Sequence, residues 1–200
     1  MKKSFVFTGI LLCTTTLLSF SQQPAEKGKL ISWTEGGVLI GNSGNTKKAP
    51  GFFRSSLNYV LYKNFSAGLG VGAEFLDESY LPVTANAFYQ FKKNKTVFPF
   101  IRFTAGYQVA LENTIRINYS VYYPSLISDY APTYSSLSKL KTQGGILFEP
   151  SAGVILYTKA DWGFVLSAGY RHQKLKYTGD NDYAFFSEYN RLLLGFGIIF

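Results

Sequence analysis

The sequence predicts an all-β fold, a closed barrel of eight antiparallel strands, and two observations lead to this prediction. Apolar and polar residues alternate with a period of two through most of the chain, which places successive side chains on opposite faces of a strand. Short and long connections alternate between these segments, as in a barrel with tight turns at one end and loops at the other.

Seven segments show the alternation clearly. They span about 53–61, 65–75, 83–91, 97–109, 146–156, 164–170 and 192–200. An eighth segment, about Leu30 to Gly41, is less regular because Glu35 interrupts its alternation, and Gly36-Gly37 predicts a β-bulge there. With this segment, the predicted number of strands is eight.

The connections agree with this number. Short joins are expected at 63–64, 92–96 and 158–161, and longer ones at 42–50, 111–142 and 178–187. The join at 77–80 is compact, although its place in the order calls for a longer one. In an even-stranded bacterial barrel, both chain ends lie on the side of the short turns, which is the periplasmic side.

The first residues predict export. Lys2 and Lys3 precede an uncharged, largely apolar run that ends near Ser19 and Ser21. This is the pattern of a cleaved signal peptide. A membrane-anchoring helix is the alternative, but Thr and Ser crowd the end of the run, and a spanning helix needs about 20 mostly apolar residues.

The domain prediction follows from the cleavage site. We expect a signal peptide over 1–21, a short periplasmic segment over 22–29 and a transmembrane barrel over 30–200. Cys13 could mark a lipid-attachment site, but Leu12 stands where a small residue is expected. Loss of Lys2 and Lys3 lowers the net charge from +8 to +6. This modest basic charge gives no reason to invoke nucleic acid.

The two faces of the strands differ in kind. The apolar faces carry almost no charge, and hydrocarbon solvates no polar group, so these faces are predicted to contact lipid. A soluble lipocalin-type barrel would carry charged residues on the exterior of every strand, and this pattern is absent. The opposite faces hold charged residues that are predicted to form a network in the lumen: Arg54, Glu74, Arg102, Glu149, Arg171 and Arg191.

An eight-stranded barrel has an interior just wide enough to be filled by side chains. The arginine–glutamate network is therefore expected to plug the lumen rather than leave a channel. Four arginines outnumber two glutamates in this set, so ordered water or tyrosine hydroxyls are expected to complete the network, because buried charges need partners.

Three segments resemble a known family. The stretches 63–74, 99–107 and 191–200 look like the small outer-membrane β-barrel superfamily, which contains the barrels of OmpA and OmpX type. The resemblance implies a Gram-negative outer membrane and contact with its lipids. The alternation that ends in Phe196, Ile198 and Phe200 also resembles the signal by which the barrel-assembly machinery recognises its clients.

Some barrels of this superfamily modify lipid A, so the resemblance also leaves a catalytic role open. The deacylase type has a His with a Ser two residues on, but the single histidine, His172, is followed by Gln173 and Lys174. No predicted loop contains a His, as the palmitoyltransferase type requires. Because metal-ligand spacing, a phosphate-binding loop and a nucleophile motif are all missing from the sequence, we expect neither catalytic site nor cofactor.

The connection 111–142 is the most individual part of the chain. Its alternation continues from Ile115 to Tyr123, so strands could extend above the membrane and offer an edge to a surface partner; a solvated loop is the alternative. Four lysines near the outer rim are expected to contact lipopolysaccharide phosphates: Lys139, Lys141, Lys174 and Lys176. Three roles remain open: a structural or surface-interaction barrel, a narrow pore and a lipid A-modifying enzyme.

Overall fold

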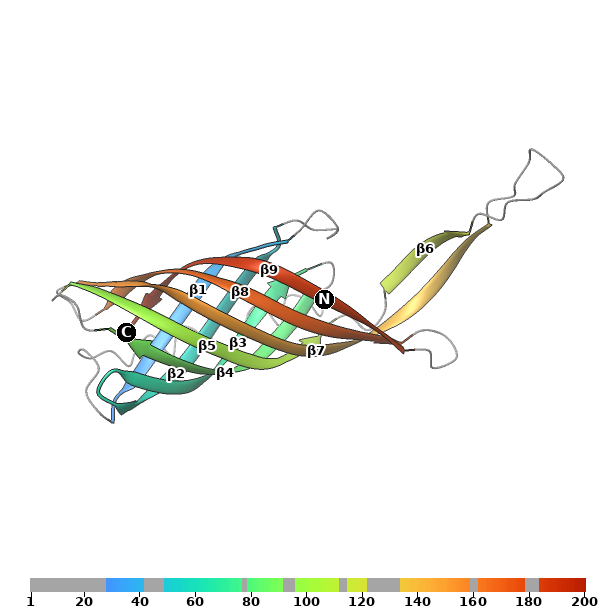
Figure 1. Ribbon diagram of the computed structural model, residues 1–200. Coiled ribbons are helices and arrows are strands. Elements are labelled where there is room, and N and C mark those ends of the chain that lie inside the picture. Colours follow the sequence, from blue (N-terminus) through green and yellow to red (C-terminus); the bar gives the residue numbers. More distant parts are fainter. Residues whose placement is uncertain are drawn as a thin grey trace, which may run out of the picture.

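The structure, a computed structural model, confirms the eight-stranded antiparallel barrel (Figure 1). It describes residues 28–41, 49–76, 79–91, 96–111, 115–121, 134–158, 162–178 and 184–200, with the backbone alone at 115–121, 134–140 and 185. The predicted signal peptide, 1–21, lies outside the described residues, as does most of the segment 22–29. No helix long and apolar enough to cross a membrane occurs in the described part.

Eight of the described strands form the barrel wall. They are β1 (Leu30–Ile40), β2 (Gly51–Tyr62), β3 (Phe65–Phe75), β4 (Ser79–Gln90), β5 (Val97–Ala110), β7 (Tyr134–Tyr157), β8 (Gly163–Thr178) and β9 (Ala184–Ile199). Each pairs antiparallel with its neighbours, and the β1–β9 and β5–β7 pairings close the sheet. The closure satisfies the backbone of every strand, as a membrane requires.

A further strand leaves the barrel. β6 (Ile115–Val121) pairs with the first part of β7, from Ile115 opposite Leu140 to Val121 opposite Tyr134. We call residues 115–121 and 134–140 the β6–β7 ribbon. Figure 1 shows it projecting from one end of the barrel. β7 therefore has 24 residues and begins well before the end of the expected connection 111–142. Likewise β8 and β9 extend into the expected connection 178–187.

The bulge predicted at Gly36-Gly37 is wrong, because β1 pairs with β2 and β9 without a shift in register. Gly37 instead permits close approach of two strands, since a Cβ there would collide with the backbone oxygen of Leu194. A register shift lies in β7, between Thr142 and Gly144. Gly144 has a φ of +86°, a conformation that suits glycine at a bulge.

The outer wall is apolar around the barrel. Large apolar side chains are exposed there on all eight wall strands, up to 70% for Leu69. They include Val38, Leu57, Leu69, Val83, Phe103, Phe148, Leu166 and Phe196. A continuous exposed apolar surface of this extent is typical of contact with lipid.

Candidate functional site

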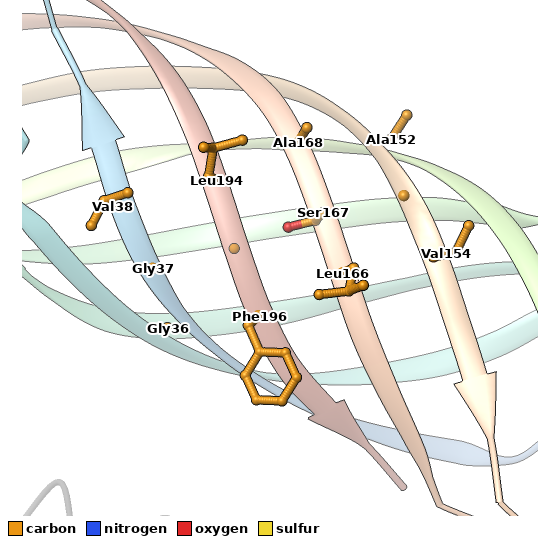
Figure 2. A pocket seen from close by; sticks show the side chains of 12 residues that line it. Gly36, Gly37, Val38, Ala152, Val154, Leu166, Ser167, Ala168, Leu194 and Phe196 are labelled. Carbon is orange, nitrogen blue, oxygen red and sulfur yellow. The ribbon is translucent and has the colours of Figure 1, made fainter.

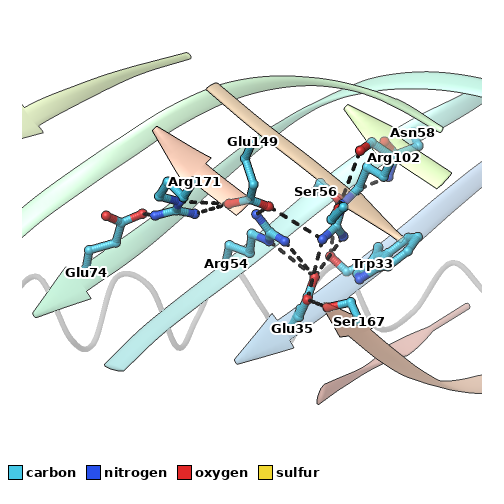
Figure 3. Close-up of polar contacts among 11 residues, drawn as sticks. Trp33, Glu35, Arg54, Ser56, Asn58, Glu74, Arg102, Glu149, Ser167 and Arg171 are labelled. Atoms are coloured by element: carbon cyan, nitrogen blue, oxygen red, sulfur yellow. Dashed lines mark hydrogen bonds and ion pairs between the residues drawn. The ribbon is translucent and has the colours of Figure 1, made fainter. Parts of the chain in front are cut away.

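The middle of the lumen holds a network of buried charges (Figure 3). Glu149 on β7 accepts hydrogen bonds from Arg54 at 2.6 Å and from Arg171 at 2.8 and 2.5 Å. Its carboxylate also lies 3.7 Å from the guanidinium of Arg102. Glu149 is fully buried and therefore relies on these three arginines for its stabilisation.

Glu35 on β1 is the second centre of the network. Its carboxylate accepts hydrogen bonds from Arg54 at 3.0 and 3.2 Å and from Arg102 at 2.8 Å. Ser167 also donates to it, and the absence of a side chain at Gly195 leaves room for it, because a Cβ there would meet the carboxylate. Arg54 and Arg102 thus bridge Glu35 and Glu149 (Figure 3).

Glu74 on β3 extends the network. It accepts hydrogen bonds from Arg171 and from Gln108. At the other side, the hydroxyl of Ser151 lies 3.2 Å from the donating Nε of Arg102. Serine and glutamine side chains therefore add to the ion pairs of the network, and the hydroxyls of Tyr80 and Tyr177 bond to each other. The participation of water stays a prediction.

The structure places all six predicted lumen residues inside the barrel, where they are buried. Five of them are joined by the contacts above. Arg191 lies opposite Arg171 in the β8–β9 register, and its guanidinium carbon lies 5.4 Å from the centre of the Tyr189 ring. With Glu35 added, three buried glutamates face four buried arginines.

Glu35 was not predicted as a lumen residue, because it shares a face of β1 with apolar residues and apolar faces were assigned to lipid. Ile31, Trp33 and Leu39 point into the lumen with Glu35 and are buried, whereas an apolar face had been assigned to lipid. The excess of arginine over glutamate among the predicted lumen residues was the available signal, because it called for a further buried acid.

Apolar clusters fill the two ends of the lumen. The cluster at the end opposite the β6–β7 ribbon, here the turn-end cluster, contains Ile31, Trp33, Val60, Phe88, Phe100, Ile155, Val165 and Ile199. The cluster at the same end as the ribbon, here the ribbon-end cluster, contains Leu39, Phe52, Leu76, Tyr80, Leu175, Tyr177 and Leu193. The sequence had predicted a polar plug alone.

Aromatic rings join these clusters to the charges. The Trp33 ring packs edge-on against Phe88 and Phe100 at centroid distances of 5.4 and 4.9 Å. The guanidinium carbon of Arg102 lies 4.5 Å from the Trp33 ring centre, within the range of a cation–π interaction. At the other end, Arg54 lies 5.3 Å from the ring centre of Phe52. The lumen is thus filled at three successive levels.

No protein-family model matches the chain, and no curated protein matches it in sequence. Solved structures do match in shape. Neisserial surface protein A superposes with a TM-score of 0.52 at 12% sequence identity, covering 85% of this chain and 95% of that one. The chain has the fold of the small outer-membrane β-barrels. The resemblance seen in the sequence is thereby confirmed for the fold, which is all that 12% identity shows.

Two further solved structures match the chain in shape. A de novo designed transmembrane β-barrel matches with a TM-score of 0.48 at 12% identity, covering 89% of this chain and 98% of that one. The N-terminal barrel of Pseudomonas aeruginosa OprF matches with a TM-score of 0.46 at 14% identity, with coverages of 88% and 100%.

The ribbon end of the barrel carries three of the four predicted lysines, Lys141, Lys174 and Lys176. Lys174 lies 3.0 Å from Glu188, and its ammonium lies 5.1 Å from the ring centre of Phe186. Lys141 is exposed and pairs in register with Thr178, and Lys176 follows Lys174 on the same outward face of β8. The side chain of Lys139 lies outside the described residues.

The only histidine of the chain faces outward below these lysines. The Oδ1 atom of Asn190 lies 2.8 Å from Nδ1 of His172 and accepts a hydrogen bond from Tyr170 at 2.7 Å. Such polar aromatic groups are typical of the membrane interface. In the described part of the barrel, no group of three or more His, Cys, Asp or Glu side chains could hold a metal ion.

The residues of the predicted assembly signal lie at the barrel seam. Phe196 is exposed on the outer wall, and Ile198 is half-buried on the same face. Phe200 exchanges two backbone hydrogen bonds with Ser32 of β1, at 2.9 and 3.1 Å. The last residue is therefore part of the closed sheet, and its recognition by the assembly machinery stays a prediction.

Proposed function

We propose that the protein is a non-conducting, non-catalytic barrel of a Gram-negative outer membrane, which holds the β6–β7 ribbon at the cell surface as an interaction element. The observation that carries the proposal is the continuity of β7. Its residues 141–157 belong to the barrel, where they pair with β8 and mostly also with β5, whereas 134–140 pair with β6 alone. The wall itself thus supports the ribbon.

The backbone of the ribbon suits a binding role. Among the described residues, β6 pairs on one side only, with β7, so its other edge offers backbone groups to an incoming strand. The partner class that fits such an edge is a polypeptide segment in extended conformation. The filled lumen supports a scaffold rather than a pore, because charges and two apolar clusters occupy it from end to end.

The orientation is tested by labelling introduced thiols on intact cells with a membrane-impermeant maleimide. Cys13 is the only cysteine of the chain and lies in the predicted signal peptide, so each introduced thiol is unique in the mature barrel. We expect Ser136→Cys in the ribbon to be labelled on intact cells. Asn64→Cys, in the turn at the opposite end, should be labelled only after the outer membrane is permeabilised. The reverse pattern would contradict the proposal.

The absence of conduction has a separate test. Purified wild-type protein in planar bilayers is expected to give no steady conductance above that of protein-free membranes, because apolar and charged side chains occupy the lumen at three levels. A large open porin in the same bilayer serves as the positive control. A steady conductance that scales with the amount of inserted barrel would favour the pore, and altered lipid A masses in cells that express the protein would favour the enzyme.

A further inference from the structure

The outer wall has a shallow apolar depression over β7, β8, β9 and β1 (Figure 2). Its volume is about 520 Å³. Small residues line its floor, namely Gly36, Ala152 and Ala168, and larger ones such as Leu166 and Phe196 rise beside them. Ala168 pairs in register with Ala152, and Leu166 with Phe196, so the floor and its sides belong to adjacent strands.

Cationic side chains lie above the depression on the same strands. The outward face of β8 runs from Leu166 and Ala168 through Tyr170 and His172 to Lys174 and Lys176. Exposed Lys141 on β7 lies beside this row, because it pairs with Thr178. Glu188 on β9 contacts only Lys174 among these lysines. From the depression toward the ribbon end, the outward side chains on this wall are therefore first apolar, then aromatic, and then basic.

The spacing of these features fits one leaflet of a membrane. Lys174 lies six positions after Ala168 on β8, which is about 20 Å at the rise of a β-strand. With strands tilted by about 40°, this corresponds to about 15 Å along the membrane normal. Half of a typical hydrocarbon core is also about 15 Å thick. A lipid headgroup at the lysines would thus have acyl chains that reach the depression.

We propose that this wall binds one outer-leaflet glycolipid that carries phosphate, the lipid A part of lipopolysaccharide. Lys141 and Lys176 bind a phosphate of the headgroup, and Lys174 also contacts this phosphate while it remains paired with Glu188. One acyl chain occupies the depression. Charge complementarity selects the anionic headgroup, and the apolar floor selects the chain. The inference rests on the orientation in the proposed function, because only that orientation places the lysines in the outer leaflet.

The test is native mass spectrometry of the intact barrel released from micelles that contain purified lipid A, phosphatidylglycerol or phosphatidylethanolamine. Lipid A should remain bound to wild-type protein in preference to both phospholipids. Lys141→Gln with Lys176→Gln should lower lipid A occupancy about tenfold or more, since each lysine near an anionic headgroup contributes to attraction. Lys63→Gln, at the opposite turn, is the matched control and should leave occupancy unchanged.

The depression is tested separately. Ala168→Phe fills it from the exposed face and should reduce retention of lipid A several-fold. Ala85→Phe makes the same change on the outward face of β4, away from the depression, and should have no effect. Equal losses in the two phenylalanine variants, or equal retention of lipid A and phosphatidylglycerol by wild type, would overturn the inference. Heat-dependent gel migration verifies that each variant is folded.

Failure of the inference can be told apart from failure of the proposed function. If Ser136→Cys is labelled on intact cells while lipid A is not retained, only the lipid site is wrong. If the thiol labelling is reversed, the lysines lie on the periplasmic side and both proposals fall.

Discussion

Replacing Glu149 with glutamine is expected to lower the free energy of unfolding of the barrel by about 3–5 kcal/mol, the range for breaking a buried ion pair by removing one partner. The reason is that one carboxylate serves Arg54, Arg102 and Arg171. The amide retains the shape of the side chain but leaves three buried guanidinium groups with less compensating charge. The measurement is reversible urea unfolding in lipid vesicles, followed by tryptophan fluorescence and gel migration.

The matched control is Glu188→Gln at the ribbon end of the barrel. Glu188 also pairs with a cation, Lys174, but both side chains are largely exposed, and exposed ion pairs contribute little. We expect no measurable change in stability for this variant. If Glu149→Gln and Glu188→Gln behave alike, the buried network does not stabilise the barrel. An Arg54–Glu149 double-mutant cycle should then give a coupling near zero instead of a clear interaction energy.

Replacing Trp33 with alanine is expected to cost about 3–5 kcal/mol of stability, as for other buried tryptophans. Trp33 is 1% exposed and packs on Phe88 and Phe100 in the turn-end cluster. The substitution also removes the aromatic face beside Arg102. The loss therefore combines a cavity with the end of a cation–π interaction.

Trp162→Ala provides the control, because Trp162 is the other tryptophan of the chain and is only partly buried near the β7–β8 turn. It contacts Phe164 on the outer wall, so its loss should cost much less. Circular dichroism and gel migration report unfolding of both variants without relying on the removed fluorophore. Equal destabilisation by the two substitutions would mean that the turn-end cluster does not stabilise the barrel.

The strands could be predicted because lipid restricts the outward positions to apolar residues. From 53 to 109 and from 146 to 200, this restriction leaves a period of two in the sequence that the structure follows. The same restriction does not apply to inward positions, where the lumen accepts Phe88 and Phe100 as readily as Arg54. Periodicity therefore indicated which residues share a face, but it could not separate charged from apolar levels of the lumen.

β1 was interpreted wrongly for the same reason. Its outward positions include the small or polar residues Thr34 and Gly36, while Ile31, Trp33 and Leu39 point inward. An apolar residue was assumed to mark the lipid face, so Glu35 looked like an interruption. Its place opposite Arg54 in the β1–β2 register depends on pairing across strands, which one strand's pattern does not contain.

The meeting of the first and last strands has a consequence for how the chain enters the membrane. Glu35 on β1 takes its partners from β2, β5 and β8, and β8 comes beside β1 only through β9. An open sheet would leave arginines without these partners and a free edge in hydrocarbon, and both are unfavourable. We therefore expect the pairing of the buried charges and the closure of the sheet to occur together, in one cooperative step. The backbone hydrogen bonds between Phe200 and Ser32 complete this step.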